Sequence, residues 1–248
     1  MSTPLVTVIM PIYNAQATLK RAIASVQTQS LTDLEICAVD DASFDKSWDA
    51  LNALAEGEPR LRIFQHKNNL GAAAARNTAL EEARGRYIAF LDADDEWLPE
   101  KLERQINFMK MEKAAFSCTA YYRIHEKGHK RITSVPKFAN RIALLKNNTV
   151  GTLTVIYDSE ILGKQSFPRI RSKEDFVIWL QFLNICNIVF GLNEPLAIYH
   201  KSKNSLSANK LLASKEQWQV LRTQQRLKLA PAIWYFINYA FNSIKRNL

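Results

Sequence analysis

The segment Arg86-Tyr-Ile-Ala-Phe-Leu-Asp-Ala-Asp-Asp-Glu-Trp-Leu-Pro99 decides how this chain folds. Residues 87–91 are uninterruptedly apolar, which is typical of a buried strand in a parallel sheet. An acidic cluster of Asp92, Asp94 and Asp95 follows, and such close carboxylates repel one another unless a cation lies beside them. Asp92 and Asp94 could therefore bind one Mg²⁺ or Mn²⁺, ions that take carboxylate oxygens. The alternative is an acidic turn before a helix that the final proline starts.

The length of the chain suits one large α/β domain, or one domain plus a tail. The 248 residues are 47% hydrophobic and 23% charged, as in folded globular proteins. Residues 199–248 hold nine Lys or Arg and one acid, so they carry +8 of the net charge of +9 and are expected to face any acidic partner. No apolar run approaches the roughly 20 residues of a membrane-spanning helix, and no signal peptide is expected.

The cysteines indicate the redox environment. Three of them lie far apart in apolar segments, without the paired spacing of metal ligands: Cys37, Cys118 and Cys186. This pattern favours reduced core thiols in a cytosolic setting.

Strand and helix patterns alternate through the first 90 residues, which predicts right-handed βαβ units and a parallel sheet. The expected strands are 5–10, 34–39, 61–64 and 87–91. Ligands of such sheets bind beyond the carboxyl ends of the strands. Polar side chains gather after three of these strands: Tyr13 and Asn14, Asp40 and Asp41, and Asp92 and Asp94. The sequence therefore predicts a ligand site at this edge.

The second half is less regular. Strands are expected at 115–124 and 150–157, a helix at 174–186, and two edge strands at 187–192 and 194–200. Residues 125–149 are polar and basic with weak periodicity, which we interpret as a mobile segment on the acceptor side.

An aromatic-rich stretch at residues 231–244 is interrupted by Asn238 and Asn242 and followed by Lys245 and Arg246. It is too short and too broken to span a bilayer, but it suits an interfacial helix. A C-terminal helix packed on the domain is the alternative, and the sequence leaves both open.

Five motifs occur in a fixed order along the chain. They are Val8-Ile-Met-Pro-Ile-Tyr-Asn14, Val39-Asp-Asp-Ala-Ser43, Asn69-Leu-Gly71 with Ala75-Arg-Asn77, Phe90-Leu-Asp-Ala-Asp-Asp95, and Glu174-Asp175. Together, over residues 4–207, they resemble the family 2 glycosyltransferases, inverting enzymes of the GT-A fold. The resemblance is strongest to bacterial enzymes of surface polysaccharide synthesis, such as those of capsule, O-antigen or teichuronic acid. It implies a catalytic domain at 1–207, with a Rossmann-type, mostly parallel sheet flanked by helices, and a helical tail at 208–248.

The resemblance also implies residues that bind the nucleotide. Pro11 and Tyr13 would line the base. Asp41 would accept the uracil N3–H, with Asp40 in support, and Arg76 would reach the base or the phosphates.

Two further pairs would carry the chemistry. Asp92 and Asp94 would form the D-x-D motif, contact the ribose and hold Mn²⁺ or Mg²⁺ at the diphosphate. Asp175 would be the catalytic base, with Glu174 the other candidate, although acids at a helix start are also favoured by the helix dipole. The family usually has Tyr-Arg before a final Ser-x-Ser, whereas this chain has Tyr199-His200-Lys201, so that diphosphate contact is not carried over.

The function implied is metal-dependent transfer of a sugar from a nucleotide-sugar, usually a UDP-sugar, to a glycan or lipid-linked acceptor. The expected location is cytoplasmic, peripheral on the inner face of the plasma membrane, with its anionic lipids as a partner. Nucleic acid is not an expected partner, because the chain has no nucleic-acid module. G-x-G-x-x-G and P-loop motifs are absent, which excludes those nucleotide-binding classes. The alternative is a non-catalytic nucleotide-sugar-binding or scaffolding protein of the same fold.

Overall fold

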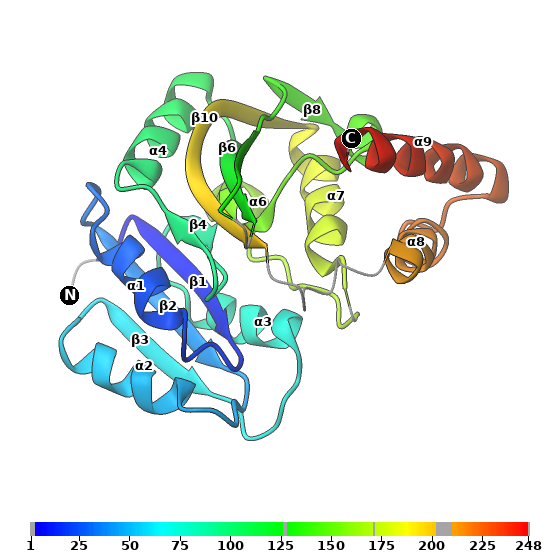
Figure 1. Cartoon of the computed structure of the whole chain (residues 1–248). Helices are drawn as coiled ribbons and strands as arrows, with labels where there is room; N and C mark the ends of the chain where they lie inside the picture. The colour runs from blue at the N-terminus through cyan, green and yellow to red at the C-terminus, as the bar shows by residue number, and fades with distance from the viewer. Residues whose placement is uncertain (1–2, 126–127, 171, 202–209, 248) are drawn as a thin grey trace.

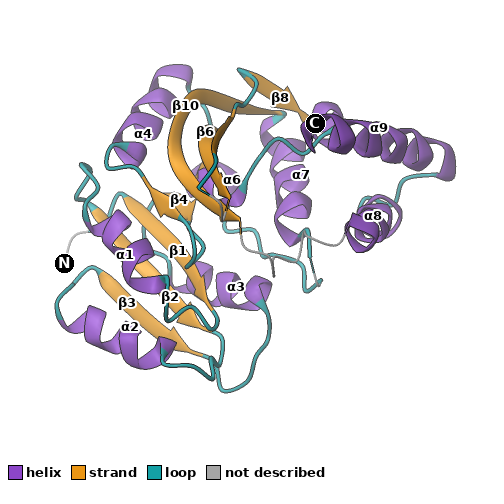
Figure 2. Ribbon diagram, viewed as in Figure 1, coloured by secondary structure: helices purple, strands orange, loops and turns teal. Residues whose placement is uncertain are grey.

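The chain folds around one mixed β-sheet with helices on both faces (Figure 1, Figure 2). The computed structural model describes residues 3–125, 128–170, 172–201 and 210–247. The strands are β1 (Val6–Ile12), β2 (Leu34–Asp40), β3 (Leu61–Gln65), β4 (Tyr87–Phe90), β5 (Glu96–Trp97), β6 (Phe116–His125), β7 (Lys130–Thr133), β8 (Phe138–Asn140), β9 (Ile156–Asp158) and β10 (Ile188–Lys201). Their order is β3-β2-β1-β4-β9-β6-β10-β5, with β7 on β6 and β8 on β10.

The N-terminal half of the sheet is parallel, as the sequence predicts. In the register, Val8 of β1 lies opposite Ile36 of β2 on one side and Ala89 of β4 on the other. Beyond β4 the pairing becomes mixed, since β9 is antiparallel to both β4 and β6. The carboxyl ends of β1, β2 and β4 consequently share one edge, where the acidic motifs lie.

Helices cover both faces. They are α1 (Leu19–Gln27), α2 (Ser47–Glu56), α3 (Ala72–Glu82), α4 (Lys101–Glu112), α5 (Arg141–Lys146), α6 (Ser159–Leu162), α7 (Glu174–Cys186), α8 (Lys210–Gln219) and α9 (Leu229–Asn247), with a 3₁₀ turn η1 (Thr152–Thr154) and a π-helical turn η3 (Val220–Gln224). Helices α1, α2 and α4 contribute to one buried apolar cluster, and α3, α5 and α7 to the other. Trp179 of α7 is fully buried, with its ring 5.7 Å from that of Phe90 and 5.5 Å from that of Phe116.

Three expectations for the second half are wrong. Residues 188–201 form one strand between β6 and β5 rather than two edge strands, because register shifts around Pro195 accommodate a residue that cannot donate to the ladder. Residues 125–149 contain β7, β8 and α5, elements too short to show a period. In place of the strand expected at 150–157, the turn η1 occupies residues 152–154, and only the end of the segment belongs to β9.

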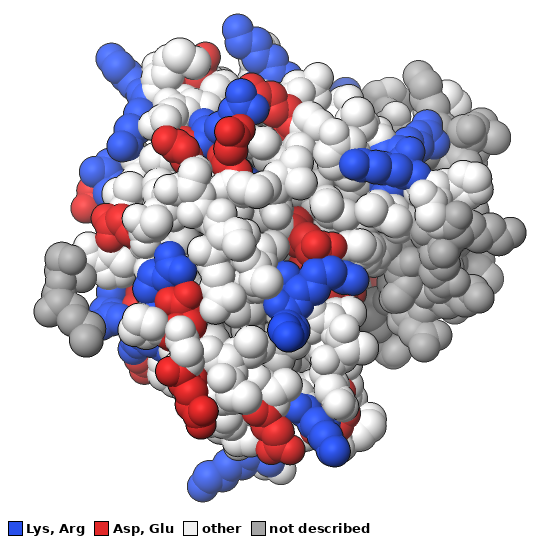
Figure 3. Space-filling model, turned by 60° about the vertical axis from the view of Figure 1, so that its left-hand side comes forward, with Lys and Arg blue, Asp and Glu red and all other residues white. Residues whose placement is uncertain are grey.

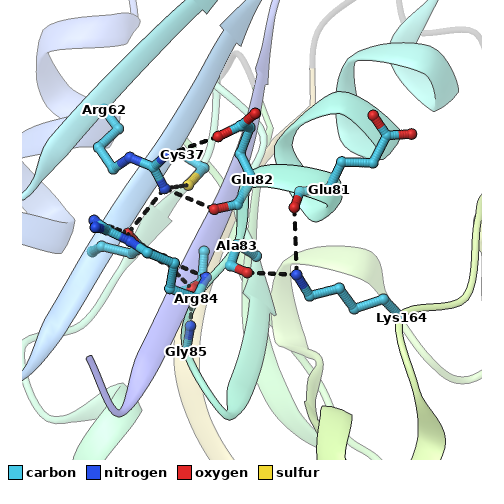
Figure 4. A network of polar contacts seen from close by, with 10 residues as sticks. Cys37, Arg62, Glu81, Glu82, Ala83, Arg84, Gly85 and Lys164 are labelled. Carbon is cyan, nitrogen blue, oxygen red and sulfur yellow. Dashed lines mark hydrogen bonds and ion pairs between the residues drawn. The ribbon is translucent and has the colours of Figure 1, made fainter. Parts of the chain in front are cut away.

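A polar network closes the opposite edge of the sheet and fixes α3. Buried Glu35 accepts hydrogen bonds from Thr7 Oγ1 (2.8 Å) and from Arg84 (2.7–2.9 Å). Burial alone would raise the pKa of Glu35, but these hydrogen bonds together lower it. Arg62 and Lys164 donate to the last carbonyl groups of α3, which caps the helix (Figure 4).

The C-terminal helices pack on the domain beside α7 (Figure 1). Val220, Leu221 and Ala232 are buried in the apolar cluster that contains α7. The other side of α9 exposes a stripe of large apolar residues: Leu229, Ile233, Trp234, Ile237 and Phe241. None of the helices in the described residues combines the length and the hydropathy that a membrane span needs. One face of α9 therefore packs on the domain, as the second interpretation of residues 231–244 expects. The interfacial interpretation concerns the opposite, exposed face.

Charged side chains of both signs lie on the surface that Figure 3 draws, and the three cysteines form no disulfide. Figure 3 shows Lys and Arg interspersed with Asp and Glu over the face that it draws. The cysteines are free thiols, two of them buried.

Candidate active site

The loops after β1 and β2 are joined by hydrogen bonds. The Asn14 backbone N–H donates to Ser43 Oγ (2.9 Å), and the Phe44 N–H donates to Asn14 Oδ1 (3.0 Å). Asn14 has a φ of +49°, a left-handed conformation that asparagine tolerates. The Tyr13 ring is 48% exposed and meets the Phe44 ring edge-on at 6.1 Å, while Pro11 in β1 is partly buried. This edge therefore presents aromatic surface of the kind that a planar base can contact.

The two aspartates after β2 have different partners. Asp41 accepts the backbone N–H groups of Leu70 (2.9 Å) and Gly71 (2.7 Å), and it contacts His66 Nδ1 at 2.7 Å. These contacts occupy three of the about four acceptor positions of a carboxylate. Asp41 thus fixes the start of α3, which explains the spacing of the Asn69-Leu-Gly71 motif.

Asp40 retains more acceptor capacity. Its Oδ2 accepts from the Ser43 N–H and from Gln65 Nε2, both at 3.2 Å. Its Oδ1 is buried and has no hydrogen-bond partner among the described residues. Both aspartates are buried, with exposed fractions of 0% for Asp40 and 2% for Asp41, so the open Oδ1 of Asp40 does not face solvent.

Helix α3 presents Arg76 to the centre of the site. Asn77 exchanges two hydrogen bonds with the backbone of Phe167, at 2.7 and 2.9 Å. The Phe167 ring lies 5.6 Å from the Arg76 guanidinium carbon, within cation–π range. The Ala75-Arg-Asn77 motif therefore positions both the arginine and the ring that supports it.

Arg76 joins two acidic motifs that are distant in sequence. Its Nη2 donates to Asp92 Oδ1 and its Nη1 donates to Glu174 Oε1, each at 2.7 Å. Arg76 is only 5% exposed, and the two carboxylates raise its pKa further although burial opposes this. For Glu174, burial raises the pKa more than the ion pair lowers it. One guanidinium thus holds the D-x-D turn against the start of α7.

Residues of α1 and β10 also form hydrogen bonds with the D-x-D turn and the residue after it. Arg21 Nη2 donates to the Asp94 carbonyl (2.9 Å), and the His200 N–H donates to Asp95 Oδ1 (3.0 Å). Desolvation, followed by the charge of Asp92, raises the pKa of Asp94. Burial and its two acidic neighbours raise the pKa of Asp95 well above its ordinary value. Negative charge at this turn therefore exceeds what the protein cations neutralise.

These residues fit a divalent cation. Asp92 contacts Arg76 through Oδ1, which leaves Oδ2 available, and both Asp92 and Asp94 offer the hard oxygen ligands that Mg²⁺ and Mn²⁺ take. In the described part of the chain, no three His, Cys, Asp or Glu residues form a complete metal cage. A cation bound here would take its other ligands from substrate phosphates and water.

Asp175 differs from Glu174 in its partners. Its Oδ2 accepts from Thr152 Oγ1 (2.8 Å) and its Oδ1 accepts from the Phe176 N–H (2.7 Å). Glu174 is bound to a buried arginine, whereas none of the described residues forms an ion pair with Asp175. A carboxylate that is oriented by a hydroxyl group but not neutralised by a cation is suited to accept a proton.

Structure and sequence agree on which motifs converge, but several supporting residues were missed. Arg76, Asp92 and Glu174 meet directly, and Asp175 follows on the same helix. The supporting residues Arg21, Thr152 and Phe167 are not predicted by the sequence, because each acts from an element far along the chain. His200 is noted in the sequence only as a departure from the family's motif. The Ser205-x-Ser207 segment lies outside the described residues.

Comparisons with known proteins agree with this geometry. Residues 7–163 match the family "Glycosyl transferase family 2". The chain is 40% identical to the putative teichuronic acid biosynthesis glycosyltransferase TuaG of Bacillus subtilis, over 99% of this chain and 98% of that protein. It is 37% identical to the Escherichia coli UDP-Glc:alpha-D-GlcNAc-diphosphoundecaprenol beta-1,3-glucosyltransferase WfgD, over 98% of this chain and 95% of that one.

Solved structures share the fold. The S. aureus TarS 1-349 complex with UDP-GlcNAc superposes with a TM-score of 0.73 at 19% identity, covering 93% of this chain and 70% of that one. The mannosyltransferase PcManGT of Pyrobaculum calidifontis, in complex with GDP-Man and Mn²⁺, gives 0.70 at 20% identity, covering 92% and 66%. The chain therefore belongs to glycosyl transferase family 2 and has its GT-A architecture.

Proposed function

We propose that this protein transfers a sugar from a UDP-sugar to a hydroxyl group of a glycan or lipid-linked acceptor, with inversion at the anomeric carbon, in the synthesis of a bacterial surface polysaccharide. The observation that carries this proposal is the Arg76 bridge. It brings the D-x-D carboxylate and the acidic start of α7 to one site at the ligand edge of the sheet. The activities named for TuaG and WfgD support the class of product and acceptor.

In this mechanism Asp175 is the catalytic base. It takes the proton of the acceptor hydroxyl as that oxygen forms a bond to the anomeric carbon. The bond from that carbon to the diphosphate breaks, and its electron pair leaves with the nucleoside diphosphate. Thr152 orients the Asp175 carboxylate, while Arg76 keeps Glu174 ionically paired and out of the proton transfer. Glu174 as the base is the competing assignment.

The donor would lie between the aromatic loop after β1 and the D-x-D turn. Tyr13 and Pro11 would contact the base. Asp41 would accept the uracil N3–H, with Asp40 in support, since the contacts with His66, Leu70 and Gly71 leave Asp41 about one acceptor position. A bound Mn²⁺ or Mg²⁺ on Asp92 and Asp94 would neutralise charge that develops on the diphosphate.

A membrane surface is the proposed location. The exposed stripe of α9 is apolar, and Lys146 of α5 lies 6.0 Å from the Trp234 ring at its border. Each Lys or Arg near an anionic leaflet contributes about 1 kcal/mol to binding. We propose that this face rests on anionic lipid headgroups at the cytoplasmic side of the membrane, where a lipid-linked acceptor would be met.

Donor binding and metal dependence can be tested together. UDP with Mn²⁺ should raise the thermal midpoint of the wild type, and Asp94→Ala should abolish that increase as well as turnover. If Asp94→Ala retains near-wild-type turnover, or if EDTA leaves the wild type unaffected, the metal assignment is wrong. If the wild type binds UDP but forms no nucleoside diphosphate from any nucleotide-sugar, the non-catalytic alternative is correct.

A further inference from the structure

The residue before the acidic pair has an unusual backbone. Lys173 is the N-cap of α7 and has φ +62° and ψ +20°, in the left-handed region. Lysine seldom adopts this conformation, which persists only where its surroundings enforce it. Because Glu174 and Asp175 follow directly, the conformation of Lys173 determines how α7 presents both carboxylates.

The C-terminal helices supply these surroundings. Lys173 Nζ donates to Gln217 Oε1 of α8 (3.0 Å) and to Tyr239 Oη of α9 (3.1 Å). It also lies 4.7 Å from the centre of the Tyr239 ring. Gln217 is only 1% exposed, and its Nε2 has no hydrogen-bond partner among the described residues. Gln217 is thus a buried side chain whose Oε1 accepts from the Lys173 ammonium group.

These two helices form a unit that is anchored elsewhere on the domain. The rings of Trp218 in α8 and Phe236 in α9 meet at 5.6 Å. Asn242 Nδ2 of α9 donates to the Lys146 carbonyl of α5 (3.3 Å), and Ala232 is fully buried. The acceptors that Lys173 meets are therefore held in place independently of the active site.

We propose that Gln217 and Tyr239 are positioning residues, which hold Lys173 and through it the turn that presents Asp175. This inference rests on the proposed role of Asp175 as the base. The C-terminal helices would then help to position the catalytic base. In α9, Tyr239 would serve this role, whereas the exposed apolar stripe would serve the proposed membrane contact.

The test is a double-mutant cycle with Lys173→Met and Tyr239→Phe, which each remove one side of the contact and retain its apolar bulk. Steady-state release of UDP from an accepted UDP-sugar gives kcat and the donor KM, and calorimetry gives the thermal midpoint. Tyr235→Phe, on the same helix, is the matched control, because the described structure shows no hydrogen bond to its hydroxyl group.

Each single variant should lower kcat by about 10-fold or more, since small misplacement of a catalytic group has effects up to roughly 10²-fold. The donor KM should change by less than about 2-fold, because the contact does not reach the nucleotide. The double variant should be no slower than Lys173→Met alone, because that substitution already removes the hydrogen bond that Tyr239→Phe removes. Lys173→Arg, which can still donate to both acceptors, should recover part of the lost kcat.

Three results would overturn the proposal. The first is a kcat within about 2-fold of wild type in both single variants, and the second is a double variant in which the two losses of kcat are fully additive. The third is a loss of kcat that is accompanied by a lowered thermal midpoint, which would show a general loss of stability. Asp175→Asn separates this failure from that of the proposed function. If Asp175→Asn is inactive while Tyr239→Phe is normal, only the positioning role is wrong. If Asp175→Asn is active, the base assignment itself is wrong.

Discussion

Replacing Arg76 by Met removes both ion pairs that join the acidic motifs. The Glu174 side chain is 14% exposed, so its lost charge-assisted hydrogen bond should cost about 1.5–3 kcal/mol. The Asp92 side chain is 35% exposed, and solvent screening reduces that loss to about 0.5–1 kcal/mol. We therefore expect Arg76→Met to lower the free energy of unfolding by about 2–4 kcal/mol at neutral pH.

The pH dependence of this loss is a sharper test than its size. Burial already raises the pKa of Glu174 in the folded protein above its value in the unfolded chain, which is about 4.5. At pH values above about 4.5, the ionised Glu174 therefore lowers the free energy of unfolding. Without Arg76, the folded-state pKa of Glu174 should rise further. Protonation removes the uncompensated charge, so the deficit should be largest near pH 8 and shrink toward about pH 5.

Urea unfolding of wild type and variant across this pH range measures the deficit, and release of nucleoside diphosphate gives the accompanying loss of turnover. Arg104→Met is the matched control. Arg104 is 52% exposed and pairs with Glu194 at 3.0 Å on the surface, so its loss should cost less than about 1 kcal/mol. A deficit for Arg76→Met that is no larger than this control, or that does not change with pH, would refute the proposed bridge.

Three further predictions concern the base, acid stability and the membrane. Asp175→Asn should lower kcat by about 10²–10⁴ with little change in donor binding, and if Glu174→Gln is the crippled variant instead, the two roles are exchanged. The lowered folded-state pKa of Glu35 stabilises the fold fully above about pH 4.5, and this contribution is lost as the pH falls through the folded value. Glu35→Gln should flatten that part of the stability profile in urea unfolding between about pH 7 and pH 3. Replacing exposed Ile237 and Phe241 by Ser should weaken salt-sensitive flotation with anionic liposomes while kcat on a soluble acceptor is unchanged, and unaltered flotation would contradict the proposed face. These substitutions are preferable to deletion of residues 229–248, which would also remove the contact with Lys173.

The parallel half of the sheet could be predicted because local signals agree there. The strands of that half are short and mostly apolar, polar residues follow them, and a helix separates each strand from the next, so period, length and turn chemistry indicate the same elements. The start of α7 at Glu174 was likewise predicted. The sequence predicts two strands in place of β10 because Asn193, next to Glu194-Pro195, is a turn-forming residue. Tertiary pairing with β6 absorbs this irregularity as register shifts around Pro195.

The site was predictable in its motifs but not in its contacts. Sequence order predicted which acids would gather at the strand ends, and the resemblance assigned them roles. It could not predict that Arg76 would bind two carboxylates, or that Asp41 would be taken up by the start of α3, because both depend on side-chain placement across the fold. The packing of α9 was open for the same reason, since one helix serves the core on one side and exposes apolar residues on the other.

Release of nucleoside diphosphate by the purified protein tests the central claim most directly. The protein would be offered UDP-, GDP- and dTDP-sugars with glycan or lipid-linked acceptors, in Mn²⁺ and in EDTA, beside Asp175→Asn. We predict release from a UDP-sugar that requires the metal and the acceptor and that Asp175→Asn abolishes. Binding of donors without release from any of them, or release that EDTA and Asp175→Asn leave unchanged, would contradict the account.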